Sequence, residues 1–210
     1  MKFILGTKLG MTQIYKGDKI VPVTLIESGS NFVSQVKTME TDGYSAVQIG
    51  FGSRKEKNIA KPQKGHIKKI SGLKPQFSNP RWLREFRVDK TEMKVGDEIG
   101  IDSFVAGEYV NIVAITKGRG CQGVVKRHGF GGGPKSHGQK DRHRAPGSIG
   151  SSWPQYVLKG MRMAGRMGGG SITIKNLEIA EIDKDKNLVA VKGAVPGRRG
   201  SLIMMSSAGK

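Results

Sequence analysis

The amino-acid sequence predicts a mainly β fold, an antiparallel barrel or sandwich. Short runs are rich in Val, Ile, Thr and aromatic residues, and several alternate apolar with polar side chains, as strands with one buried face do. Turn sequences such as Asp42-Gly43 separate the runs at roughly the 8–12 residue spacing of antiparallel β proteins. The predicted strands are residues 19–26, 32–37, 44–51, 109–116, 171–182 and 187–192.

Residues 52–100 differ from their surroundings and are predicted to form a small mixed α/β insertion. Within it we expect a short basic helix at 62–70, a strand at 82–88 and a turn at 94–99. The barrel itself is then assigned to residues 1–51, 101–116 and 169–210.

Residues 117–168 are expected to form a long basic loop without helical or strand periodicity over most of its length. The whole chain has 36 Lys and Arg against 17 Asp and Glu, a formal net charge of +19. This stretch holds 11 of those cations but only one acid, Asp141. A loop of this length inside a compact domain indicates function, and its charge indicates a polyanionic partner.

The candidate RNA contacts in this stretch are regularly spaced cations and rings. Cations can replace the counterions of a phosphate backbone, and histidine, Trp153 or Tyr156 can stack on bases. Glycines such as Gly129 and Gly138 allow the backbone to approach phosphate and ribose. The candidates are Lys117, Arg119, Lys126, Arg127, His128, Lys135, His137, Lys140, Arg142, His143, Arg144, Trp153, Lys159, Arg162 and Arg166. We expect the stretch to become ordered when RNA binds.

Alternatives to RNA binding have weaker support. Trp153 and Tyr156 would equally suit a role in pinning the returning limb of the loop to protein. The histidines and Cys121 lack the spacing and carboxylate partners of a metal site, so no metal or cofactor is expected. The match of residues 118–123 to GxGxxG lacks the rest of a dinucleotide-binding unit.

Two rival functions remain open. A histidine-dependent ribonuclease, or another basic RNA-processing protein, would need a positioned base with a hydrogen-bonding partner, and Asp141 is the one carboxylate available in the stretch. A DNA-binding protein is the other alternative, and it predicts equal or stronger affinity for duplex DNA of the same length.

The sequence also predicts a cytoplasmic protein without a membrane segment. Cys121 is the single cysteine, so an internal disulfide is impossible and a reducing compartment is expected. The three-residue apolar run near the start is too short for a signal-peptide core. No small-molecule substrate is expected.

Particular motifs resemble the bacterial form of the large-ribosomal-subunit protein three family. The motifs are ILGTKLGMTQ at 4–13, GVVKR at 123–127, HRAPGSIG at 143–150, MAGRMG at 163–168 and VKGAVPG at 191–197. The resemblance extends from residue 1 to about residue 200.

The resemblance implies a barrel of the translation-factor type and an rRNA-threading extension that reaches toward the peptidyl transferase centre. It also implies direct binding near the 3′ end of the large-subunit rRNA, a role in starting subunit assembly, and contacts with large-subunit proteins fourteen and nineteen. The chain departs from the family at two positions. Ser151 follows the PGSIG motif where many members have a side-chain-methylated glutamine, so that modification is not expected, and Cys121 occupies a commonly aromatic position.

Overall fold

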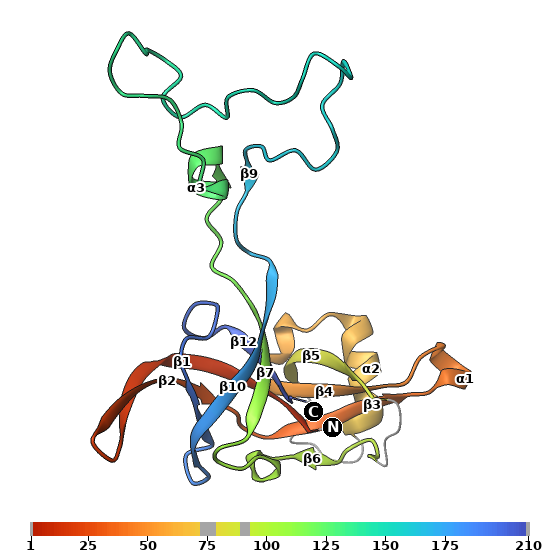
Figure 1. Cartoon of the computed structure of the whole chain (residues 1–210). Helices are drawn as coiled ribbons and strands as arrows, with labels where there is room; N and C mark the ends of the chain where they lie inside the picture. The colour runs from red at the N-terminus through yellow and green to blue at the C-terminus, as the bar shows by residue number, and fades with distance from the viewer. Residues whose placement is uncertain (1, 72–78, 89–92, 209–210) are drawn as a thin grey trace. The chain divides into compact units, whose positions relative to one another are not determined.

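The computed structural model describes residues 2–71, 79–88 and 93–208, and divides the chain into two compact units. One unit comprises Met1–Ile115 with Ser171–Lys210, and the other is Thr116–Gly170. Strands predominate over helices (Figure 1), which confirms the prediction of a mainly β fold.

The first unit contains six antiparallel strands paired in a closed ring, in the order β1-β12-β7-β10-β11-β2. The strands are β1 (Phe3–Lys16), β2 (Lys19–Glu27), β7 (Tyr109–Ile115), β10 (Ser171–Asp183), β11 (Leu188–Lys192) and β12 (Leu202–Ser207). Four of them match runs predicted from the sequence. The first and last strands were not predicted, although they pair with each other from Phe3 opposite Ser206 to Thr7 opposite Leu202.

Alternation of side chains explains how these strands fill the barrel. In β7, Val110, Ile112 and Ala114 are buried while Tyr109 and Ile115 are exposed, because successive side chains of a strand point to opposite faces. The buried residues form one core with isoleucines and valines of the other barrel strands.

Strands β3 (Asn31–Lys37) and β4 (Ala46–Ser53) correct the predicted domain limits. Both lie in the range 1–51 that the sequence assigns to the barrel, but they belong to a separate four-stranded sheet of order β5-β4-β3-β6, with β5 (Pro80–Arg87) and β6 (Glu98–Ile99). β3 and β4 pair as an antiparallel hairpin whose connection contains the short helix α1 (Met39–Asp42). The other edge of β4 pairs with β5 along its length. β4 pairs with β3 and β5, and β3 pairs with β4 and β6, so both edges of each strand are used within this sheet and not by the barrel.

Strand β1 joins the two sheets because both of its faces are buried. Ile4 packs in the barrel core, whereas its neighbours Phe3 and Leu5 pack in a second core with Val33 and Ile49. Phe3 also stacks on Phe86 of β5, with ring centroids 4.7 Å apart.

The predicted helix, strand and turn of the insertion are all present. Helix α2 (Lys61–Ser71) covers the expected range, β5 covers the expected strand, and Gly96 has a φ of +93° in the turn before β6. Short 3-10 turns lie at Glu56–Asn58 and Ile101–Ser103.

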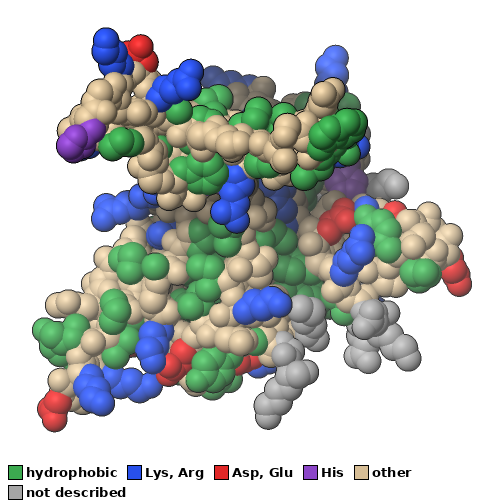
Figure 2. All heavy atoms as spheres, turned by 45° about the horizontal axis from the view of Figure 1, so that its top comes forward, with side chains coloured by type: hydrophobic (Ala, Val, Ile, Leu, Met, Phe, Trp, Pro, Cys, Tyr) green, Lys and Arg blue, Asp and Glu red, His purple; other side chains and the backbone are tan. Residues whose placement is uncertain are grey.

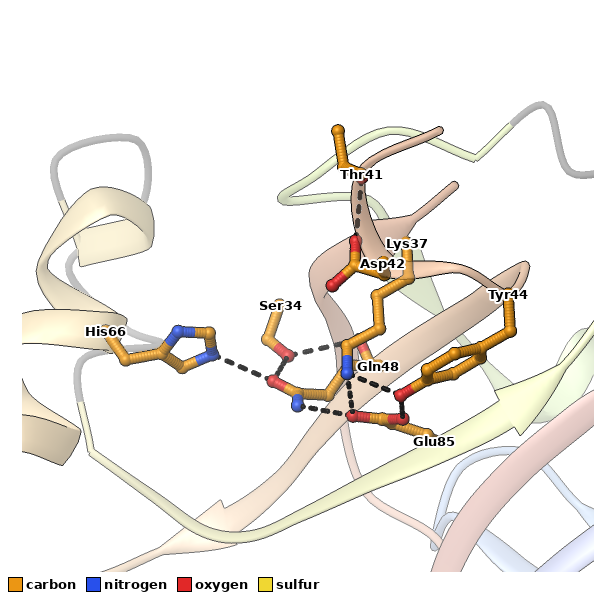
Figure 3. Close-up of polar contacts among 8 residues, drawn as sticks. All are labelled: Ser34, Lys37, Thr41, Asp42, Tyr44, Gln48, His66 and Glu85. Atoms are coloured by element: carbon orange, nitrogen blue, oxygen red, sulfur yellow. Dashed lines mark hydrogen bonds and ion pairs between the residues drawn. The ribbon is translucent and has the colours of Figure 1, made fainter. Parts of the chain in front are cut away.

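A polar network ties α2 to this second sheet (Figure 3). The His66 Nε2 lies 2.9 Å from the Gln48 Oε1, which also accepts a hydrogen bond of 2.8 Å from the Ser34 hydroxyl. Since the amide oxygen can only accept, the His66 Nε2 donates. Gln48 in turn donates to the Glu85 carboxylate at 3.2 Å.

Candidate nucleic-acid interface

The second unit, Thr116–Gly170, begins and ends in a narrow antiparallel ladder. Strand β8 (Cys121–Gln122) pairs with β9 (Gly165–Arg166), and the Arg119 amide donates to the Met167 carbonyl at 2.9 Å. The Met167 amide returns a bond of 2.9 Å to the Gly120 carbonyl. The two limbs of the basic stretch are therefore held together at their base.

Gly168 is required at this base by two independent constraints. Its φ is +71°, a conformation that L side chains rarely adopt. A Cβ at this position would also collide with the Lys117 carbonyl oxygen of the opposite limb. Gly168 thus allows close backbone approach between the two limbs.

Helix α3 (Val124–His128) follows β8 and was not predicted, since five residues give no helical periodicity. It ends at Gly129, whose φ of +75° supplies the left-handed cap typical of helix C-termini. Val124 is buried, which fixes the helix locally.

Two predicted RNA contacts, Arg127 and His128, are committed to protein. The Arg127 Nη1 donates to the Met163 carbonyl at 2.8 Å, and the His128 Nε2 lies 3.0 Å from the same oxygen. Both side chains are partly buried. They hold the outgoing and returning limbs together, and only their remaining nitrogen atoms are available to a ligand.

A tight turn around the glycine run follows α3. The Gly133 amide donates to the His143 carbonyl at 3.0 Å, and the His143 Nε2 lies 3.1 Å from the Gln139 carbonyl oxygen. A Cβ on Gly132 would collide with the His143 carbonyl oxygen. Beside this turn lies a solvent-open pocket of about 520 Å³, and its lining includes Phe130 and Arg142. Phe130 and Gln139 are not among the residues predicted from the sequence, although their position beside the glycines and Arg142 was a usable signal.

The remaining predicted contacts are exposed. They are Lys117, Arg119, Lys126, Lys135, His137, Lys140, Arg142, His143, Arg144, Trp153, Lys159, Arg162 and Arg166. Trp153 and Tyr156 are 79% and 68% exposed, so these rings do not pin the limb to protein within the described structure. Both are free to stack on a ligand.

Charge separates this unit from the rest of the described chain. In the first unit, several lysines form ion pairs with Asp or Glu, among them Lys2, Lys37, Lys184 and Lys192. Between residues 116 and 170, all of which the structure describes, no Lys or Arg forms an ion pair. Figure 2 shows Lys and Arg side chains spread over the visible face of the molecule, with Asp and Glu side chains in separate small groups.

The described residues contain no group of three or more His, Cys, Asp or Glu side chains placed to hold a metal ion. Cys121 is exposed with a free thiol. None of the helices in the described ranges is both long and apolar enough to cross a bilayer.

Comparison with known proteins agrees with the motifs. The family described as ribosomal protein L3 matches residues 85–194. Proteins named large ribosomal subunit protein uL3 are similar over nearly the whole chain. The relative from Herpetosiphon aurantiacus is 50% identical over 99% of this chain and 96% of its own length, and that from Chlorobium limicola is 49% identical over 99% of both. The relative from Cutibacterium acnes is 48% identical over 100% of this chain and 93% of its own length. The chain therefore belongs to the ribosomal protein L3 family.

Proposed function

We propose that the protein is a structural constituent of the large ribosomal subunit in the cytoplasm, and that residues 117–168 are its main rRNA-binding surface. The single observation that carries this proposal is the group of 11 Lys and Arg side chains in this stretch that lack ion-pair partners across the described residues. Ten of these cations are exposed and available to phosphate, whereas Arg127 bonds to the Met163 carbonyl and offers only its remaining nitrogen atoms.

Binding is driven by counterion exchange. Each phosphate that contacts a Lys or Arg releases condensed cations. The logarithm of the affinity therefore falls linearly with the logarithm of the salt concentration, and each contact contributes roughly 0.7 to 0.9 to this salt slope. If about 6 to 10 cations engage, affinity falls by several powers of ten between low and moderate salt.

RNA shape supplies the specificity. The deep groove of an A-form helix hides base edges from side chains, so phosphate, 2′-hydroxyl and unstacked bases are the accessible groups. The exposed rings of Trp153 and Tyr156 suit stacking on an unstacked base.

The resemblance to the family adds finer features to the proposal. The barrel is of the translation-factor type, and the basic stretch threads the rRNA toward the peptidyl transferase centre. The protein binds near the 3′ end of the large-subunit rRNA, helps to nucleate assembly and contacts large-subunit proteins fourteen and nineteen. The strand ladder and helix α3 support this by giving the base of the stretch a defined shape.

The ribonuclease alternative is disfavoured by the histidines themselves. His128 and His143 bond to backbone carbonyls, and among the residues that the structure describes neither bonds to a carboxylate that could orient it as a base. The family is one of structural ribosomal proteins, which confirms the expectation that the chain is not an enzyme.

The test compares two charge-matched variants of the full chain. One replaces Lys135, Lys140, Arg142 and Arg144 by Gln. The control replaces four exposed lysines that already form ion pairs, namely Lys2, Lys64, Lys184 and Lys186. Both lose four positive charges.

Affinity is measured from 50 to 500 mM KCl on a transcribed fragment holding the 3′ domain of a bacterial large-subunit rRNA. In the first variant, the slope of log affinity against log salt concentration is expected to fall by about 3, since each of the four lost phosphate contacts removes roughly 0.7 to 0.9 of slope. The affinity is expected to fall by at least roughly tenfold. The control is expected to stay within a few fold of the wild type. Equal losses in both variants would refute the proposed surface, and a wild-type slope near zero would refute rRNA binding altogether.

A further inference from the structure

Lys8 of β1 is a buried lysine outside the basic stretch, with only 9% of its surface exposed. Its ammonium group donates to the carbonyl oxygen of Val195 and, at 3.3 Å, to that of Gly197. Removing an ammonium group from water is costly unless its protons find acceptors. These two carbonyls supply acceptors, and both belong to the loop between β11 and β12, residues 193–201, here called the β11–β12 loop.

The backbone of Lys8 holds the same loop a second time. Its amide donates to the Ser201 carbonyl at 3.1 Å, and its carbonyl accepts from the Gly200 amide at 2.7 Å. One residue of β1 therefore fixes the loop through its amide, its carbonyl and its side chain.

Further contacts complete the bracing of the β11–β12 loop. At its start, the Gly193 amide donates to the Pro22 carbonyl at 2.9 Å, and the Thr24 hydroxyl donates to the Gly193 carbonyl at 2.7 Å. At its end, the Ser201 hydroxyl donates to the Arg198 carbonyl at 2.7 Å. Gly197, with a φ of +97°, packs where a Cβ would collide with the Ser201 hydroxyl.

The braced loop presents two adjacent arginines to solvent. Arg198 and Arg199 are both exposed, and neither forms an ion pair among the described residues. The Arg199 guanidinium lies beside Gly10 of β1: a Cβ added to Gly10 would lie 3.5 Å from the Arg199 Nε. A planar guanidinium suits two-pronged recognition of phosphate oxygens.

We propose that the β11–β12 loop is a second, preorganised phosphate-binding site for RNA on the barrel, with Arg198 and Arg199 as ligands and Lys8 as the positioning residue. The inference rests on the proposed rRNA-binding function and adds a site to it. Because the barrel already holds the loop, fewer degrees of freedom are lost when phosphate binds, and the entropy cost of binding is smaller.

The ligand test replaces Arg198 and Arg199 by Gln in the full chain and measures binding to the same rRNA 3′-domain fragment over a range of KCl. We expect the salt slope to fall by about 2 and the affinity at moderate salt to fall by roughly tenfold. The charge-matched control replaces Lys184 and Lys186, whose charges already pair with Asp102 and Asp183. It should bind as the wild type does.

The positioning test replaces Lys8 by Met, which leaves both arginines in place. We expect affinity to fall nearly as far as in the arginine variant, with no further loss when the substitutions are combined. Trypsin cleavage after Arg198 or Arg199 in the native protein should become faster. Ser201→Ala, at a half-buried position, removes only the hydroxyl bond to the Arg198 carbonyl. It should show the same changes in affinity and cleavage to a smaller degree. If the Lys8 variant does not fold, this variant tests whether bracing of the loop is needed for binding.

The outcomes separate the two proposals. A wild-type chain with a flat salt dependence overturns the proposed function itself. A steep wild-type dependence that the arginine variant leaves unchanged overturns the second site alone, and points to an acidic protein segment as the ligand of the two arginines.

Discussion

The Lys37 ammonium on β3 lies 2.9 Å from the Glu85 carboxylate on β5, although β4 runs between these strands. Gln48 of β4 stands opposite Glu85 and donates to it, and Tyr44 accepts from Lys37 at 2.6 Å and donates to Glu85 at 2.8 Å (Figure 3). The network thus links three strands of the second sheet through one carboxylate.

Glu85→Gln is expected to lower the free energy of unfolding at neutral pH by about 1 kcal/mol, a value reduced by partial exposure to solvent. Partial burial raises the pKa of Glu85, but hydrogen bonds from Lys37, Tyr44 and Gln48 outweigh it and hold the pKa below its ordinary value. Urea unfolding monitored by Trp fluorescence measures the difference.

The sign of the pH dependence follows from that depressed pKa. The stabilisation is complete above the unfolded-state pKa of Glu, about 4.3, and is lost as the pH falls through the lower folded-state pKa. The stability difference between wild type and Glu85→Gln should therefore shrink below about pH 4.3. A difference that stays constant from pH 7 to pH 3 would contradict an ionic role for Glu85.

Gly168→Ala is expected to open the strand ladder at the base of the basic stretch. The new Cβ meets the Lys117 carbonyl oxygen, and φ at this position is +71°. Hydrogen–deuterium exchange should accelerate at the Arg119 and Met167 amides, which bond across the ladder. Gly170→Ala is the matched control, because a Cβ there meets nothing within 4 Å. Equal exchange in the two variants would show that the ladder tolerates the side chain.

Ile112→Ala should lower the free energy of unfolding by about 2–5 kcal/mol, since Ile112 is fully buried in the barrel core and its truncation leaves a cavity. Ile115→Ala, three residues along the same strand at a position 52% exposed, should cost well below 1 kcal/mol. Denaturant midpoints compare the two. Similar costs would place Ile112 outside a well-packed core.

Strands with local alternation were predictable, whereas strands defined by distant partners were not. β7 and β11 alternate or concentrate β-branched residues, so their sequences alone indicated strands. β1 is interrupted by Gly6 and Gly10 and is buried on both faces at its start, which removes the alternation. The sheet to which β3 and β4 belong depends on β5, a partner that the strand sequences themselves do not specify.

The candidate interface was predictable in composition and less so in its internal contacts. Charge density identified residues 117–168, and most of the named cations are exposed. The contacts of Arg127 and His128 with the Met163 carbonyl oxygen could not be predicted from the sequence, because that oxygen lies 35 residues or more away along the chain. Arg198 and Arg199 were missed since two cations scarcely alter the charge of their segment.

The pairing of β1 with β12 also sets the order of events during synthesis. The ring of strands cannot close until residues 202–207 have been made, whereas the basic stretch is complete some 35 residues earlier. During that interval the basic stretch is complete, whereas the ring of strands still lacks β12. Closure of so distant a pair is intrinsically slow. The basic stretch, which is the proposed RNA-binding surface, is thus synthesised in full before the last strand that closes the barrel.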